Sequence, residues 1–187
     1  MTQKRPIAGA IHDLQARLGS IRIAVTAVAG LDLDAETRNA MLTSASEESV
    51  RASAELAGVG ALAACLLENA SPLHLDVNAA ARAAADTAAL AGLSVDAPVE
   101  ATAVAEVSTE LLVPVFSALL RIVGGAGKQI GVVMTSNTAR VSVLVERVGA
   151  DADSDALPPL VDYLLEAIGA TREPHDNGLA FSFAVAP

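Results

Sequence analysis

The sequence has no tryptophan, and its aromatic residues are three phenylalanines and one tyrosine among 187 residues. Hydrophobic residues make up 52% of the chain, so its core has to be filled by Ala, Val, Leu and Ile. A core of small aliphatic residues suits helices that pack closely. At this length and hydrophobic content we expect one ordinary domain or two small ones, and disorder as the general state is excluded.

Basic residues are also few. Lys and Arg number 12 against 22 Asp and Glu, which gives a formal charge of -10 and a pI near 4.6. This balance argues against nucleic acid as a partner, because its binding rests mainly on neutralising phosphates with Lys and Arg. It favours instead a protein surface that carries basic patches.

The sequence has a single cysteine and no long uncharged apolar run. Cys65 cannot form a disulfide within the chain, which favours a reduced intracellular compartment. No segment reaches about 18 uncharged apolar residues, the length that would cross a membrane. The first residues, MTQKRPIAGAIHD, are basic but hold no continuous apolar stretch of the kind found in signal peptides. We therefore expect a soluble cytoplasmic protein with no membrane partner.

Residues 1–70 carry a helical pattern in two stretches. In each, apolar or small residues recur at alternating spacings of three and four, as in a heptad seam. The first seam comprises Ile7, Ile11, Leu14, Leu18, Ile21, Val25 and Val28, and the second Leu42, Ala45, Ser49, Ala52, Leu56, Val59, Ala63 and Leu66. Between them, GLDLD predicts a turn in which Asp34 caps the second helix.

One pair of helices cannot bury both seams by itself. Two hairpins from two chains close a four-helix bundle around one core. We therefore expect residues 1–70 to form a hairpin that dimerises with a second copy of the chain. Its shared core is expected to include Ile11, Leu14, Leu18, Leu56, Val59 and Leu66.

Residues 71–187 predict a mixed domain. Ala-rich helix formers, terminal glycines and β-branched stretches separate its helices from its strands. Helices are expected at 75–92, 108–125 and 157–169, and strands at 93–97, at 101–107 and in two hairpins that turn at 136–138 and 176–178. This order indicates a layered α/β sandwich, so the expected fold class is α+β, with the helical hairpin first.

The segment AIHDLQARLGSI, residues 10–21, places a His-Asp pair within the first helix. With the order of elements that follows, it makes the whole chain resemble the histidine kinases, which join a dimeric phosphoacceptor hairpin to an ATP-binding α/β domain. In that family a phosphorylatable histidine precedes Asp or Glu and then an apolar residue, and His12, Asp13 and Leu14 stand in that order. The resemblance implies that His12 is the phosphoacceptor.

The nucleotide site of that family is not retained in the sequence. Its magnesium-binding asparagine aligns with Ile122, whose aliphatic side chain offers no oxygen to a hard cation. Of the adenine-binding Asp-x-Gly-x-Gly pattern, Gly149 alone remains in ERVGADADSD, and the segment before the last helix is too short for an ATP lid. We expect no ATP, no other cofactor and no autokinase activity.

What remains resembles the dimeric histidine phosphotransferases built on a degenerate kinase fold. Those proteins relay a phosphoryl group between receiver-domain aspartates, and HDLQARLGSI follows their acceptor helix, although Ala16 and Arg17 replace the family's Ser or Thr and Pro. The resemblance implies response-regulator receiver domains as partners, with a hybrid histidine kinase as a further candidate. It implies that magnesium is supplied by the receiver and that this chain binds no metal.

The chemistry of phosphoryl transfer points to the same residues, because it depends mostly on positioning and electrostatics. His12 follows the seam position Ile11 by one residue, or about 100° around the helix, so we expect it on an exposed flank. Asp13 is placed to orient the imidazole and accept its proton. Arg17 and Gln15 are the candidates for contact with the phosphate or the receiver.

Other interpretations of these residues stay open. Asp13 serves equally well as a solvated helix charge, and Arg17 as an ion-pair partner on the surface. The alternative function is a non-catalytic, kinase-like dimer that sequesters a response regulator or regulates a histidine kinase. His74 and His175 have no Cys or His at metal-ligand spacing, and we interpret both as structural.

Overall fold

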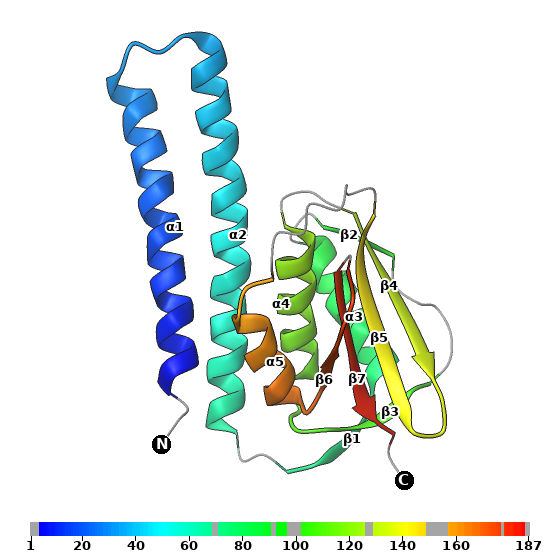
Figure 1. Cartoon of the computed structure of the whole chain (residues 1–187). Helices are drawn as coiled ribbons and strands as arrows, with labels where there is room; N and C mark the ends of the chain where they lie inside the picture. The colour runs from blue at the N-terminus through cyan, green and yellow to red at the C-terminus, as the bar shows by residue number, and fades with distance from the viewer. Residues whose placement is uncertain are drawn as a thin grey trace.

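The structure is a computed structural model that describes residues 4–68, 71–90, 93–96, 102–125, 129–148, 157–176 and 178–185, with the backbone alone at residues 4–6 and 90. Within these residues the chain forms a helical hairpin followed by a sandwich of helices on a mixed sheet (Figure 1). The expected α+β fold class is therefore confirmed. Gly149, the remnant of the adenine-binding pattern, lies outside the described residues.

The hairpin consists of α1 (Lys4–Gly30) and α2 (Ala35–Leu67). As predicted, Asp34 caps α2: its carboxylate accepts a hydrogen bond from the Thr37 backbone N–H at 2.8 Å and another from the Thr37 hydroxyl at 2.7 Å. The side of α1 that meets α2 is half-buried and follows the heptad spacing. It comprises Ile7, Ala10, Leu14, Arg17, Ile21, Ala24 and Val28.

A second side of α2 packs against the sandwich. Ala54, Gly58 and Ala61 are buried there, and Gly58 lies against side chains of α4 (Leu112–Gly124) and α5 (Leu160–Ile168). Figure 1 shows both helices between α2 and the sheet. At the lower end of α2, the Thr109 hydroxyl donates a hydrogen bond to the Glu68 carboxylate. The hairpin is thus fixed to the sandwich by apolar packing and by a polar contact.

The described residues form a five-stranded sheet of order β2-β4-β5-β7-β6 and a two-stranded sheet of β1 and β3. The strands are β1 (Leu73–Asp76), β2 (Ser94–Asp96), β3 (Val104–Val107), β4 (Gln129–Ser136), β5 (Arg140–Val148), β6 (Thr171–Glu173) and β7 (Gly178–Ala184). β2 runs parallel to β4, and the other pairs are antiparallel. Both predicted hairpins are present, as β4-β5 and β6-β7.

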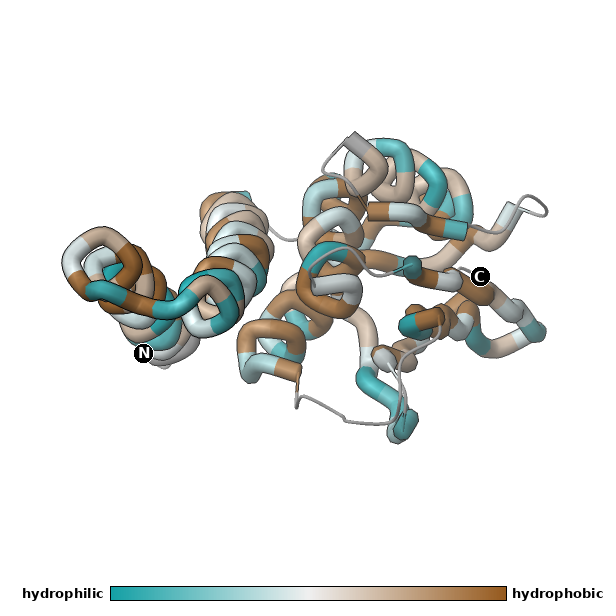
Figure 2. Tube along the Cα trace, turned by 90° about the horizontal axis from the view of Figure 1, so that it is seen from above, coloured by the Kyte–Doolittle hydropathy of each residue, from teal (hydrophilic) through white to brown (hydrophobic). Residues whose placement is uncertain are grey.

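The core lies between the sheet and the helices α3 (Val77–Leu90), α4 and α5. Alternate residues of β4, β5 and β7 face it, as Leu179, Phe181 and Phe183 do on β7. All three phenylalanines of the chain meet here, since Phe116 of α4 lies 5.6 and 6.2 Å from the two phenylalanines of β7, centroid to centroid. Viewed from above, hydrophobic residues occur both along the helices and strands of the sandwich and along the two helices of the hairpin (Figure 2).

Two details differ from the sequence-based expectation. β1 was not predicted, because four residues give too little pattern and the strand is defined by its antiparallel pairing with β3, Leu73 opposite Val107. The helix expected to open at Ser108 or Thr109 begins at Leu112. The Thr109 hydroxyl instead accepts a hydrogen bond from the Leu111 backbone N–H at 3.0 Å, which makes a turn before the helix.

α2 is long and apolar enough, by length and composition, to cross a membrane. The core helix of a soluble protein can have the same length and composition, and a third of the most apolar 18-residue stretch of α2 is buried inside the molecule. This property therefore does not by itself assign α2 to a membrane.

Candidate functional site

His12 lies on the exposed surface of α1. The half-buried residues Ala10, Leu14 and Arg17 point toward α2, and successive helical residues turn by about 100°. His12 precedes Arg17 by five residues, so the imidazole projects about 140° away from the Arg17 direction. The side chain is accessible on the outer flank of the hairpin, where the sequence placed it.

Gln15 is also exposed, and it lies three residues after His12 on the same side of α1. The helix therefore brings together two of the four candidate site residues. Asp13 and Arg17 point toward the other side, so the structure divides the candidates into two pairs.

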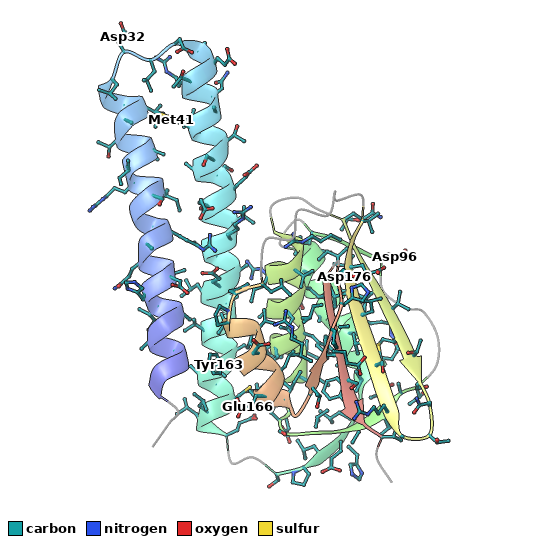
Figure 3. All side chains as sticks on the ribbon, viewed as in Figure 1. Asp32, Met41, Asp96, Tyr163, Glu166 and Asp176 are labelled. Atoms are coloured by element: carbon teal, nitrogen blue, oxygen red, sulfur yellow. The ribbon has the colours of Figure 1, made fainter. Side chains whose placement is uncertain are left out.

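Asp13 borders a cavity of about 100 Å³ at the junction of the hairpin and α5. The residues around this cavity are Gly9, Ala10, Asp13, Glu55, Pro158, Pro159, Leu160 and Tyr163. Figure 3 shows Tyr163 on α5, beside the lower part of the hairpin. Because neighbouring residues of a helix diverge by about 100°, Asp13 and His12 open onto different sides of α1. The role of Asp13 toward the imidazole stays a prediction.

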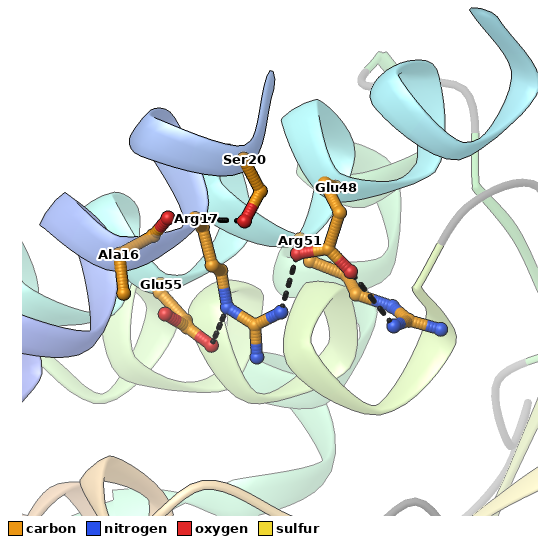
Figure 4. A network of polar contacts seen from close by, with 6 residues as sticks. All are labelled: Ala16, Arg17, Ser20, Glu48, Arg51 and Glu55. Atoms are coloured by element: carbon orange, nitrogen blue, oxygen red, sulfur yellow. Dashed lines mark hydrogen bonds and ion pairs between the residues drawn. The ribbon is translucent and has the colours of Figure 1, made fainter. Parts of the chain in front are cut away.

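Arg17 lies between α1 and α2 in a network of ion pairs (Figure 4). Its Nε donates to Glu55 Oε1 at 3.0 Å, and its Nη1 donates to Glu48 Oε2 at 2.7 Å. The other oxygen of Glu48 accepts from Arg51 Nη1 at 3.1 Å. The structure thus shows Arg17 as an ion-pair partner, and its contact with a phosphate or a receiver stays a prediction.

The pKa values of Arg17 and Glu55 are both shifted in this network. Burial of Arg17 lowers its pKa, but the hydrogen bond to Glu48 and the charges of Glu55 and Glu48 outweigh burial and raise the pKa overall. Glu55 is 5% exposed, and burial raises the pKa of its carboxyl although Arg17 opposes the shift. The negative charges of Asp13 and Glu48 raise it further. Glu55 is therefore the carboxylate whose charge costs most here.

Glu48 and Glu55 were missed by the sequence analysis. The signal was present, since both residues occupy the inner side of α2 with Ala45 and Ala52, three residues after each alanine. A charged residue at such a position predicts a partner on the facing helix, and Arg17 occupies the equivalent position between Leu14 and Ile21.

Ile122, where the resemblance to the kinases implies a lost magnesium ligand, is buried in α4. Its Cδ1 atom would lie 3.3 Å from a Cβ atom on Gly58, so this side chain packs toward α2. Among the described residues, no group of three or more His, Cys, Asp or Glu side chains is arranged to hold a metal ion.

No family model matches the chain, and no curated protein matches it either. Among solved structures, the chain is similar to the histidine kinase AdeS of Acinetobacter baumannii, with 16% identity over 95% of this chain and 94% of that one, and a TM-score of 0.47. It is similar to the catalytic domain of the histidine kinase ThkA, with 13% identity over 62% of this chain and 96% of that one, and a TM-score of 0.43. A bacterial phosphotransferase shares 15% identity over 94% and 91% of the two chains, with a TM-score of 0.40. These values do not assign the chain to a family.

Proposed function

We propose that this chain is a histidine phosphotransferase of two-component signalling. His12 accepts a phosphoryl group from an aspartate of one receiver domain and passes it to an aspartate of another, without ATP. The observation that carries this proposal is the exposed position of His12 within a His-Asp-Leu sequence, on a helix held by α2. A solvent-accessible nucleophile on a rigid element is what phosphoryl transfer requires.

The proposed transfer needs no cofactor bound to this chain, because each bond that forms is matched by one that breaks. A neutral imidazole nitrogen of His12 attacks the phosphorus of the receiver's aspartyl phosphate, the N–P bond forms, and the P–O bond to the aspartate breaks. The receiver carboxylate leaves as the anion. The imidazole proton passes to Asp13 or to water, and the same steps run in reverse toward the second receiver. Magnesium in the receiver's acidic pocket neutralises the phosphoryl oxygens.

The receiver contacts in this proposal come from the exposed side of α1, with Gln15 beside His12. The surplus of acidic residues favours a receiver surface with basic residues around its phosphorylation site. A hybrid histidine kinase is a candidate donor through its own receiver domain. Such partners act in the cytoplasm, which is where we propose that the chain works.

The proposed active form is a homodimer. On α1 the exposed apolar residues Ile11, Leu18 and Val25 recur every seven residues and form one row. On α2 a second row has the same spacing, with the exposed Leu42 and Leu56 seven residues before and after Ser49. The cavity at Asp13 places α5 along one flank of α1, and Gly58 places α4 and α5 along one flank of α2. Both apolar rows lie on the opposite flank, so a second hairpin can cover them together.

Absence of ATP binding is the second part of the proposal. Ile122 occupies the aligned magnesium position and is buried against the α2 side of α4, where it offers no ligand oxygen. Titration of the protein with magnesium-ATP at millimolar concentration in a calorimeter is expected to give no heat of binding. Tight binding would restore an autokinase function.

Incubation with receiver domains carrying a radiolabelled phosphoryl group tests the relay directly. The chain is expected to acquire a label that is labile in acid and stable in alkali, as a phosphoramidate is, and to lose it to a second, unlabelled receiver. His12→Gln is expected to abolish labelling. His74→Gln, at another exposed histidine, is the matched control and is expected to label normally. Receiver binding without any label would support the non-catalytic binding module instead.

A further inference from the structure

The contact between α1 and α2 is apolar or small along the described part of α1, with Arg17 as its charged member. Facing it, Glu48 and Glu55 interrupt the alanines of α2, Ala45 and Ala52. The contact between the two helices therefore has one charged layer, which contains the guanidinium of Arg17 and two carboxylates.

We propose that Arg17, together with Glu48 and Glu55, fixes the rotation of α1 about its own axis and thereby fixes the direction in which His12 points. Arg17 is then a positioning residue for the phosphoacceptor. Its connection to phosphoryl transfer rests on the proposed function, whereas its effect on the orientation of α1 does not.

The geometry of the fork carries this proposal. Arg17 Nε is bound to Glu55 at 3.0 Å and Arg17 Nη1 to Glu48 at 2.7 Å. The two glutamates are seven residues apart, which is about 10.5 Å along a helix, so the guanidinium lies between two levels of α2. Glu48 is itself held by Arg51 at 3.1 Å. Rotation of α1 in either direction withdraws the fork from both carboxylates together.

The position of the charged layer is unique along α2. The residues at the same heptad position one repeat above and one repeat below the two glutamates are Met41 and Leu62. Displacement of Arg17 by one repeat would leave it beside one carboxylate and one apolar side chain. Displacement toward Met41 would also leave Glu55, which is buried, without Arg17, and an unpaired buried charge is costly. Displacement toward Leu62 would leave Glu48 with Arg51 alone.

The apolar part of the α1–α2 contact cannot define the rotation of α1 as sharply as the charged layer does. Small residues lie on the contacting sides of both helices, among them Ala10 and Ala24 of α1 and Ala45 and Ala52 of α2, and small side chains interdigitate little. Polar residues at seam positions of coiled coils specify one arrangement at a cost in stability. Burial of Glu55 to 5% exposure is a cost of that kind.

His12 and Arg17 belong to one continuous helix, so the angle between them is set by helix geometry at about 140°. With the guanidinium held against α2, the imidazole is held on the outer flank. Loss of the fork would allow His12 to sample a range of directions, and attack on phosphorus in line with the leaving oxygen would become rarer.

Paired spin labels on the full chain test the proposal. Cys65 is replaced by Ala, and exposed Ala8 of α1 and Ser44 of α2 are replaced by Cys for labelling, in protein diluted with unlabelled chain. The test variant combines Arg17→Met with Glu48→Leu and Glu55→Leu, which leaves an apolar layer and no unpaired charge. Arg22→Met, at an exposed arginine of the same helix, is the matched control.

The parent and the Arg22→Met protein are expected to give one narrow distance distribution. The triple variant is expected to fold at least as stably but to give a broadened distribution, to bind the receiver with unchanged Kd, and to take up phosphate at least about ten times more slowly. Arg17→Lys alone keeps the charge but not the fork, and it is expected to take up phosphate at a rate between those of the parent and the triple variant.

An unchanged, narrow distribution in the triple variant would overturn the rotational role of Arg17, whatever the transfer rates are. A broadened distribution with an unchanged rate would overturn its role in positioning His12. Failure of the parent protein to take up phosphate would contradict the proposed function, while the distance measurements would still decide the rotational role.

Discussion

Gly58 of α2 and Leu160 of α5 lie so close that a Cβ atom on the glycine would stand 2.9 Å from Leu160 Cδ2. Ile122 and Leu164 approach the same point to 3.3 and 3.4 Å. We expect Gly58→Val to reduce the free energy of unfolding by about 1–3 kcal/mol, because the branched side chain has to displace packed neighbours. Urea-induced unfolding measures the change.

Gly60 is the matched control for that prediction, since it belongs to the same helix and no atom lies within 4 Å of a Cβ added there. Gly60→Ala is expected to raise the free energy of unfolding by about 0.5–1 kcal/mol, because glycine is unfavourable within a helix. If Gly58→Val were as stable as the parent, the hairpin would not be packed on α5 as described.

Introduction of a charge at Leu18 is expected to dissociate the proposed dimer. Leu18 is 52% exposed in one chain and lies in the apolar row that a second hairpin would cover. Leu18→Glu would bury an unpaired carboxylate in that core, which costs several kcal/mol. Analytical ultracentrifugation at micromolar concentration measures the outcome.

Ile23 provides the control for Leu18. It is 66% exposed on the same helix, but it follows Leu18 by five residues and so points about 140° away from the apolar row. Ile23→Glu is expected to leave the dimer intact. A parent protein that sediments as a stable monomer would contradict the proposed dimer altogether.

Glu55 is expected to make stability depend on pH. Burial raises the pKa of its carboxyl above the ordinary value of 4.5, so the folded chain binds this proton more readily than the unfolded chain does. The Glu55 contribution is therefore favourable at low pH, and it is lost as pH rises from about 4.5 through the raised pKa. Glu55→Gln is expected to remove this decline.

Unfolding in urea at a series of pH values and one protein concentration tests the Glu55 prediction. The groups that face Glu55 are Asp13 and Arg17 of α1, Glu48 of its own helix and Tyr163 of α5, and all four remain in the variant. Identical pH profiles for the parent and Glu55→Gln would show that the buried carboxyl does not titrate in this way.

Asp13→Asn is expected to slow phosphate uptake by about 10²-fold if the carboxylate accepts the imidazole proton, since that is the usual scale for a positioned acid or base. Asp86→Asn, at an exposed position of α3, is the control and should leave the rate unchanged. Rapid-quench measurement of label on the chain gives both rates. An unchanged rate in Asp13→Asn would leave Asp13 as a surface charge without affecting the role of His12.

The elements that the sequence predicted well have strong local signals. Asp34 and Gly169 mark helix ends through a side-chain cap and a left-handed backbone with φ of 77°. The alternation of Leu179, Phe181 and Phe183 identifies the face of β7 that lies in the core. β1 lacked such a signal, because its pairing with β3 joins residues far apart in the chain.

The candidate site was predictable only in part for a similar reason. The helical period is a local property, and it was enough to place His12 and Gln15 on the exposed side of α1. The partners of Arg17 lie 31 and 38 residues away, so their identity depended on how the two helices face each other. The sequence shows charged residues on both helices, but neither predicted seam includes Arg17, Glu48 or Glu55, and the pairing between them required the folded hairpin.

The uneven cover along α2 implies that the hairpin does not open uniformly. Between the start of α2 and residue 51, the structure shows one buried residue, Ala45. Further along, where α4 and α5 pack on the helix, the buried residues are Ala52, Ala54, Glu55, Gly58, Ala61 and Leu62. Backbone amide protons near the turn should therefore exchange with deuterium faster than those at residues 52–62, because local opening there breaks fewer contacts. If a second chain covers the apolar rows, this exchange should slow as protein concentration rises. The two ends of one continuous helix would then report on different events, assembly near the turn and unfolding of the whole chain at the other end.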